Sequence, residues 1–264
     1  MHAPDINPIA FHIGPLAIHW YAISYLAAFG MAWWLGNRLA DRPNSPFNRE
    51  QVADIVFYGA LGVLLGGRLG YILFYQPTYF LHHPVEIFFL WRGGMSFHGG
   101  ALGVVIALWV YGRSLNKNLL VITDFVAPMI PLGLGFGRIA NFINQELWGK
   151  VTDVPWGMIF KTGGPLPRHP SQLYEAFLEG LVLFVILWLY AKKPRPVGSL
   201  TGLGIATYGV FRFFVEFFRQ PDAFLGYRAF GWLTQGQILS VPMIIIGIGL
   251  MIWAMQRNKN RTKD

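Results

Sequence analysis

The chain has 264 residues, of which 54% are hydrophobic and only 13% are charged. So small a charged fraction excludes an ordinary soluble domain of this length and indicates a protein of the bilayer. The net charge is +8, but Lys and Arg gather in short loops between apolar segments and at the C-terminal end, which does not resemble a nucleic-acid surface. The sequence contains no cysteine, so it offers no disulfide, no thiolate metal ligand and no cysteine nucleophile.

The opening stretch, residues 1–21, lacks the basic start and the small-residue cleavage site of a secretory signal peptide, so we expect the first helix to remain in the mature protein. A helix needs about 20 mostly apolar residues to cross a bilayer. Seven transmembrane helices are expected, near residues 17–37, 53–75, 96–113, 119–138, 174–191, 198–217 and 236–256. The sequence thus predicts an all-α integral membrane protein, with residues 1–264 forming a single polytopic membrane domain.

Basic residues at the ends of these segments predict the orientation. Seven crossings place twelve Lys and Arg residues on one side, which the positive-inside rule assigns to the cytoplasm. They are Arg38, Arg42, Arg49, Arg113, Lys117, Lys192, Lys193, Arg195, Arg257, Lys259, Arg261 and Lys263. The N-terminus is then outside and the C-terminus inside. The longest outer connection, residues 140–173, is rich in Gly and Pro and is expected to form a small head or lid between the fourth and fifth helices.

Glycines recur at four-residue spacing within three of the predicted helices. They are Gly62, Gly66 and Gly70, then Gly99 and Gly103, then Gly133 and Gly137. This spacing lets helix backbones approach closely, so we interpret these glycines as packing positions. No repeat in the sequence is strong enough to argue for an inverted-repeat transporter.

A polar run, residues 137–149 (Gly-Arg-Ile-Ala-Asn-Phe-Ile-Asn-Gln-Glu-Leu-Trp-Gly), ends the fourth predicted helix. Arg138 stands where this helix reaches the outer leaflet, and its fork of donors suits a lipid phosphate. The alternative is an arginine that merely snorkels to the interface. Asn141, Asn144 and Glu146 add a polar cluster that simple anchoring does not need, and ionisable groups at membrane depth indicate function.

A charged stripe lies within the aromatic run of residues 211–222. Arg212, Glu216 and Arg219 are spaced four and three residues apart, so they are predicted to share one helix face. Such a stripe could be a structural ion network. Alternatively, Arg212 at the depth of Arg138 would let two guanidinium groups clamp one phosphate.

His98 lies in the run Gly93-Gly94-Met95-Ser96-Phe97-His98-Gly99-Gly100, at the outer start of the third predicted helix. Histidine can accept a proton near neutral pH, which makes His98 a candidate base. A hydrogen-bonded structural histidine is the equally open alternative.

These motifs together resemble the prolipoprotein diacylglyceryl transferase family of bacteria. The resemblance runs from His19-Trp20-Tyr21 through Gly66-Gly67-Arg68, the His98 run, residues 137–149 and 211–222 to Gly236-Gln237-Ile238-Leu239-Ser240. It implies transfer of a diacylglyceryl group from phosphatidylglycerol to the lipobox cysteine of a prolipoprotein signal peptide. It also implies a multi-pass protein of the bacterial inner membrane, with residues 140–173 in the periplasm.

The resemblance implies roles for particular residues as well. Expected catalytic residues are His98, Arg138, Arg212 and Tyr21, although an interfacial aromatic belt would also explain Tyr21. Expected substrate-binding residues are Arg138, Asn141, Asn144, Glu146, Gly149, Arg212, Glu216 and Arg219. No cofactor is expected, and no metal, because the histidines do not form a ligand constellation with acidic residues.

Three further charged residues lie inside predicted helices. Arg68 is expected to pair with Glu175 or Glu179, because a buried ion pair would relieve the cost of all three. Residues 169–175, His-Pro-Ser-Gln-Leu-Tyr-Glu, are expected to order the outer head. Ser171 lacks the G-x-S-x-G context of a hydrolase nucleophile.

Two other classes of function remain open on the residues alone. A transporter or lipid flippase would hold a headgroup with the same arginines, but it should be polar through the whole bilayer. Apart from Arg68, Asp54 and Asp124, the polar residues cluster toward the outer leaflet. An intramembrane hydrolase is disfavoured because no serine, cysteine or paired-aspartate site is evident.

Overall fold

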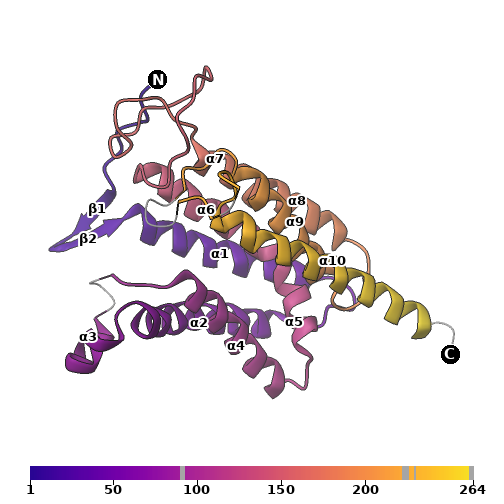
Figure 1. The fold of residues 1–264 in the computed structure, drawn as a ribbon. Helices are drawn as coiled ribbons and strands as arrows, with labels where there is room; N and C mark the ends of the chain where they lie inside the picture. Colours follow the sequence, from indigo (N-terminus) through magenta and orange to yellow (C-terminus); the bar gives the residue numbers. More distant parts are fainter. Residues whose placement is uncertain (90–92, 222–225, 229, 262–264) are drawn as a thin grey trace. The chain divides into compact units, whose positions relative to one another are not determined.

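A computed structural model describes residues 1–89, 93–221, 226–228 and 230–261 (Figure 1). Asp222 and Lys263, which entered the expectations above, lie outside the described residues. The chain divides into two compact units. Unit 1 comprises Met1–Ala32 and Val126–Asp264, and unit 2 comprises Trp33–Phe125.

All seven segments predicted to be helical are helical. They are α1 (Trp20–Ala40), α2 (Arg49–Tyr75), α4 (Phe97–Ser114), α5 (Leu119–Val126) continuing through the 3-10 turn η3 (Ala127–Met129) into α6 (Ile130–Ile143), α7 (Ser171–Glu175) continuing through the π-helix η4 (Ala176–Val182) into α8 (Leu183–Tyr190), α9 (Ser199–Val215) and α10 (Gln235–Arg261). The short helices α3 (Pro77–His82) and η1 (Pro84–Phe88) lie between α2 and α4.

Within the described residues, four helical stretches are long and apolar enough to cross a bilayer: Arg49–Tyr75, Leu119–Ile143, Ser171–Tyr190 and Gln235–Asn260. Ser199–Val215 is a shorter apolar helix. The structure is therefore that of a mostly helical multi-pass membrane protein. Seven crossings and the orientation stay predictions, as does a single domain spanning the whole chain.

The N-terminal segment differs from expectation. Strands β1 (Ile9–Ile13) and β2 (Leu16–His19) pair antiparallel, and Ile13 lies opposite Leu16. The first helix therefore begins at Trp20 and not near residue 17. The reason is the two-residue connection Gly14-Pro15, in which Gly14 takes a φ of 58° that suits a tight hairpin turn.

Residues 144–170, between α6 and α7, contain no helix or paired strand of their own. Two bridges close this segment on itself, Val151 with Arg168 and Met158 with Arg168. The chain start is also attached to it, because the Ile159 amide donates to the Met1 carbonyl over 2.9 Å. Figure 1 shows the N-terminus at the same end of unit 1 as this segment. The expected head therefore exists as a distinct segment, and its periplasmic position stays a prediction.

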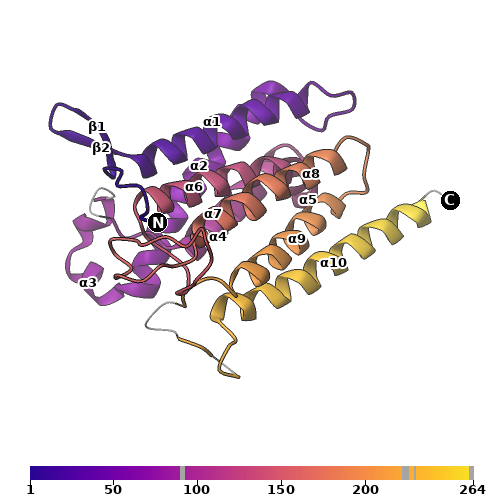
Figure 2. The same cartoon turned by 90° about the horizontal axis from the view of Figure 1, so that it is seen from above.

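Glycines let the helices of unit 1 approach closely. An added Cβ at Gly180 of η4 would lie 2.8 Å from the Cα of Gly135 in α6. A Cβ at Gly202 of α9 would lie 2.7 Å from the carbonyl oxygen of Gly247 in α10, and Figure 2 shows α9 and α10 side by side. These contacts hold η4 against α6, and α9 against α10.

In unit 2, α2 and α4 meet at the glycines predicted to pack helices. A Cβ at Gly70 would lie 2.7 Å from the Cα of Gly99, and one at Gly66 would lie 2.7 Å from the Cα of Gly103. The packing interpretation is thus confirmed for α2 and α4. In unit 1, a Cβ at Gly133 would lie 3.2 Å from the Cβ of Ala28. At Gly137 a Cβ meets no described atom within 4 Å, so close packing is not seen there.

Candidate active site

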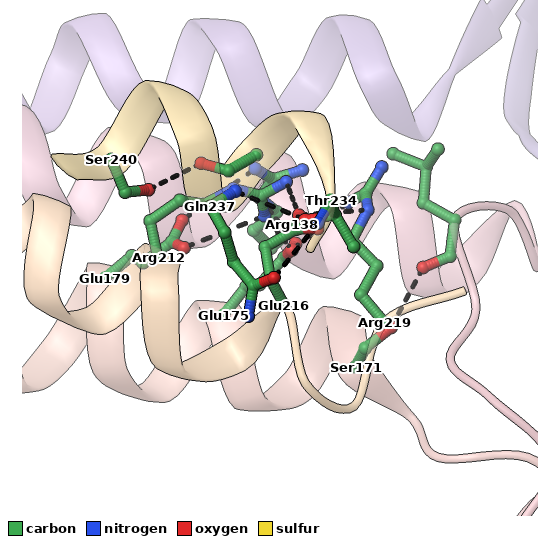
Figure 3. Close-up of polar contacts among 12 residues, drawn as sticks. Arg138, Ser171, Glu175, Glu179, Arg212, Glu216, Arg219, Thr234, Gln237 and Ser240 are labelled. Carbon is green, nitrogen blue, oxygen red and sulfur yellow. Dashed lines mark hydrogen bonds and ion pairs between the residues drawn. The ribbon is translucent and has the colours of Figure 1, made fainter. Parts of the chain in front are cut away.

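Three arginines and three glutamates gather inside unit 1, and we call them the arginine–glutamate cluster (Figure 3). They are Arg138 of α6, Glu175 of α7, Glu179 of η4, Arg212 of α9, and Glu216 and Arg219 just after α9. The two arginines predicted to act together, Arg138 and Arg212, are therefore brought to one place.

Glu175 is the centre of this cluster. The Nε of Arg138 lies 2.9 Å from its Oε2, and Nη1 of Arg219 donates to its Oε1 over 3.1 Å. Nη1 of Arg212 also donates to Oε1. The Glu175 side chain is 0% exposed, so its charge is removed from water and depends on these arginines.

Glu216 holds Arg212 from the other side. Nη2 of Arg212 donates to Oε1 of Glu216, while the Thr234 hydroxyl donates to Oε2 over 2.7 Å. Thr234 is fixed in turn, because its amide donates to Oε1 of Gln237 over 3.0 Å in the first turn of α10. A Cβ at Gly236 would lie 2.6 Å from Glu216 Oε1, so only glycine leaves this carboxylate in place.

Glu179 has fewer polar contacts than Glu175 and Glu216. Its side chain is 1% exposed, and the nearest cationic nitrogens are Nη2 of Arg138 at 3.8 Å and Nη1 of Arg212 at 3.9 Å. Among the described residues neither of its oxygens accepts a hydrogen bond. It lies on the π-helix η4, a kind of irregularity that is frequent at functional sites.

Arg138 is the most exposed arginine of the cluster. Its side chain is 21% exposed, compared with 16% for Arg212 and 11% for Arg219. Within the described part of the chain its nearest carboxylate contact is made through Nε, while Nη2 approaches Glu179 only to 3.8 Å. Of the three arginines, Arg138 is therefore the most accessible to an anion.

Four other predicted site residues form a network at the C-terminal end of α6. Nδ2 of Asn141 donates to Oε1 of Glu146 over 2.8 Å and to the Tyr21 hydroxyl over 3.4 Å. Nδ2 of Asn144 reaches the same glutamate oxygen at 3.4 Å. Asn141 follows Arg138 by one turn of α6, so this network adjoins the cluster.

Close packing around Gly149 leaves no room for a side chain. Its amide donates to the carbonyl of His169 over 2.8 Å, and an added Cβ would lie 2.5 Å from the carbonyl oxygen of Phe218 and 2.6 Å from that of His169. Gly149 therefore joins the segment 144–170 to the chain that leaves α9.

Two expectations about this region are wrong. Arg68 does not pair with Glu175 or Glu179, because its guanidinium donates to backbone carbonyls of its own unit. Arg219 does not continue the helix face of Arg212. Helix α9 ends at Val215, and Arg219 instead forms a bridge with Gly149, because the Phe218 carbonyl accepts from the Lys150 amide.

The family model described as prolipoprotein diacylglyceryl transferase matches residues 8–253. The chain belongs to the prolipoprotein diacylglyceryl transferase family.

Curated members of this family are similar along nearly the whole chain. A protein of Pseudomonas aeruginosa, strain UCBPP-PA14, is 56% identical over 260 residues, covering 98% of each chain. A protein of Coxiella burnetii, strain Dugway 5J108-111, is 54% identical over 261 residues, covering 99% of this chain and 100% of its own. Both are named phosphatidylglycerol--prolipoprotein diacylglyceryl transferase.

In this diacylglyceryl transferase family member, His98 belongs to unit 2 and the arginine–glutamate cluster belongs to unit 1. It is exposed, and it is the second residue of α4. Ser96 caps this helix by accepting a hydrogen bond from the Gly99 amide over 3.2 Å. This cap fixes the backbone of the first turn of α4, which contains His98.

Sequence reasoning missed Thr234 and underestimated Glu175. The spacing of Thr234 and Gln237 is that of a capping box, which could have indicated the start of α10. Tyr208, one turn before Arg212, is close enough to Glu179 and Arg212 to interact electrostatically, and no motif indicated it. Across the described ranges, no group of three His, Asp or Glu side chains is arranged to hold a metal.

Proposed function

We propose that the protein transfers the diacylglyceryl group of phosphatidylglycerol to the cysteine thiol of a prolipoprotein lipobox, as the first step of lipoprotein maturation. The single observation that supports this most is the convergence of Arg138 and Arg212 on one buried anion, Glu175, among apolar helices. The names of the 54–56% identical relatives agree with it.

The chemistry requires stabilisation of a phosphate. The thiolate sulfur attacks a glycerol carbon, the carbon–oxygen bond to phosphate breaks, and a thioether and glycerol phosphate result. Negative charge grows on phosphate oxygens, so guanidinium groups fixed in place lower the barrier. We assign this contact to the accessible nitrogens of Arg138, together with Arg212.

Glu175 and Glu216 are then orienting groups. An arginine side chain loses about 2 kcal/mol of conformational entropy when it is held in one rotamer. A buried carboxylate that already holds one edge of the guanidinium group means that this entropy is not lost when the lipid binds. Arg219 contributes to the same arrangement through its contact with Glu175. Tyr21, Asn141, Asn144, Glu146 and Gly149 are proposed to line the adjoining part of the substrate site.

His98 is proposed to take the proton of the thiol. The ordinary thiol pKa is about 8.5, so only a small fraction is thiolate at neutral pH without a base or a positive field. His98→Ala should then lose transfer at neutral pH but keep phosphatidylglycerol binding, and higher pH should restore part of the rate. Loss of lipid binding without such recovery would reassign His98 to the phosphate site or to the fold.

We also propose that the protein lies in the bacterial inner membrane, with seven crossings, the head in the periplasm, the N-terminus outside and the C-terminus inside. The basic residues on one side of the helices motivate this orientation. A reporter that is active only in the periplasm, fused to the C-terminus, should be silent. A strong signal would overturn the topology.

A transfer assay tests the reaction itself. Purified protein in vesicles would receive phosphatidylglycerol with one label in the diacylglyceryl part and another in the headgroup, plus a lipobox peptide. The first label should appear on the peptide cysteine, and the second should be released as glycerol phosphate. Lipid movement between leaflets without transfer would indicate a flippase, and peptide cleavage would indicate a hydrolase.

A further inference from the structure

Arg68 is a buried cation that the proposed reaction does not use. It lies on α2, is 6% exposed, and stacks over the Phe80 ring at 5.1 Å. All its hydrogen-bond acceptors within the described ranges are backbone carbonyls. They are those of Ile87 (from Nε, 2.9 Å), Gly93 and Gly94 (from Nη1, 2.6 and 3.2 Å), and Glu86 and Phe89 (from Nη2, 2.6 and 3.4 Å).

These carbonyls belong to two short stretches of the connection before α4, residues 86–89 and 93–94. A buried guanidinium group needs partners on every donor edge, and the connection needs partners for its carbonyls. Each supplies what the other lacks. Gly93 and Gly94 make this possible, because φ values of 79° and 80° let consecutive carbonyls reach the same group.

The connection leads directly to His98. Three residues separate Gly94 from His98, and the Ser96 amide between them donates to the carbonyl of Gly67 over 2.9 Å. Gly67 and Arg68 are consecutive, so one turn of α2 fixes both the end of the connection and the first turn of α4. The close approach of Gly70 to Gly99 then fixes the helix itself.

We infer that Arg68 is a positioning residue that holds the first turn of α4, and with it His98, in the geometry that the reaction needs. This inference rests on the base role proposed for His98. The planar fork of Arg68 reaches carbonyls on both stretches at once, whereas the ammonium group of a lysine is a single point with three donors. Charge alone should therefore not replace it.

The test compares Arg68→Lys with Arg113→Lys, a control at the other end of α4, where the arginine packs over Trp109 at 5.6 Å. Transfer from phosphatidylglycerol vesicles to a lipobox peptide would be measured at about pH 7 and about pH 9, where more of the thiol is ionised in solution. Arg68→Lys should lower kcat at the lower pH about tenfold or more, leave the lipid KM unchanged, and recover at the higher pH. Arg113→Lys should match the wild type at both.

Hydrogen exchange separates positioning from general loss of structure. In Arg68→Lys, the amides of residues 94–100 should exchange faster, while those of residues 138–143 in α6 should not change. If that variant does not fold, Gly94→Ala serves instead. Its Cβ would lie 2.5 Å from the Tyr71 ring and would move the acceptors without altering Arg68.

Three outcomes are distinguishable. No transfer by the wild type would end the proposed function. If the wild type transfers but higher pH does not restore transfer by His98→Ala, the base role of His98 is refuted, and this inference with it. If both hold, an equal loss in Arg68→Lys at both pH values, or unchanged exchange in residues 94–100, would overturn the inference alone.

Discussion

Arg138 contacts Glu175 through Nε at 2.9 Å, and its side chain is still 21% exposed. Glu175 thus fixes the Nε edge of the guanidinium group in a side chain that an external anion can still approach. A charge held in this way is already oriented when a phosphate arrives, so less entropy is lost on binding.

We expect Arg138→Lys to lose about 10–100-fold in kcat/KM, because a lysine ammonium reproduces the charge but not the paired hydrogen bonds of a guanidinium to phosphate. The measurement is diacylglyceryl transfer at equal protein abundance in the membrane. Arg195→Lys, an exposed position over Tyr190, is the control. Near-wild-type transfer by Arg138→Lys would refute the phosphate contact.

We expect Glu175→Gln to lower the free energy of unfolding by roughly 3–5 kcal/mol, because it leaves three arginines around a buried site without its negative charge. Thermal unfolding in one detergent measures this. Asp41→Asn is the control, because the Asp41 to Arg49 ion pair is exposed and should matter little. Equal unfolding temperatures for the two variants would show that Glu175 is not the centre of the cluster.

We expect Gly149→Ala to lose both transfer and the attachment of residues 144–170 to the end of α9. Its Cβ would lie 2.5 Å from the Phe218 carbonyl oxygen, which is too close for any carbon atom. Limited proteolysis of residues 144–170 measures the attachment. Gly249→Ala, where a Cβ meets no described atom within 4 Å, should remain as resistant as the wild type. Unchanged proteolysis of Gly149→Ala would contradict the packing role.

The helices could be predicted from sequence because a long run of apolar residues in a membrane protein indicates a helix. The signature residues Asn141 and Glu146 could be placed together because they follow one another around the end of α6. The partners of Glu175 could not be predicted, because charge alone does not distinguish Arg68 from Arg138. Only the packing of α6 against η4 decides this, and Arg68 is satisfied by carbonyls that carry no sequence signal.

Two local errors have similar causes. The helix period of Arg212, Glu216 and Arg219 predicted one continuous face, but α9 ends at Val215 and Arg219 forms a bridge with Gly149. A contact between residues so far apart in the sequence cannot be read from a short stretch of it. The hairpin before α1 was missed because its apolar residues extend the pattern of the first span. Gly14-Pro15 was the available signal.

We expect the free energy of unfolding to decrease as the pH falls, because His169 is harder to protonate in the folded protein. Burial first, and then the charge of Lys150, lower the pKa of His169 below its ordinary value of about 6.5. As pH falls below about 6.5, the unfolded chain gains a proton that the folded protein resists, so stability is lost in that window. Unfolding followed across this range should show a slope that His169→Gln reduces. An equal slope in the variant would exclude His169 as the cause.

The most direct test of the central claim is the distance between the lipid phosphorus and the guanidinium nitrogens of Arg138, measured by solid-state nuclear magnetic resonance. Nitrogen-labelled protein would be examined in phosphatidylglycerol bilayers, with Arg138→Lys to assign the signal. We predict a nitrogen to phosphorus separation of about 4 Å, as a direct charge-assisted hydrogen bond requires. A signal that is the same in Arg138→Lys, or no close phosphorus in the active wild-type protein, would contradict the account.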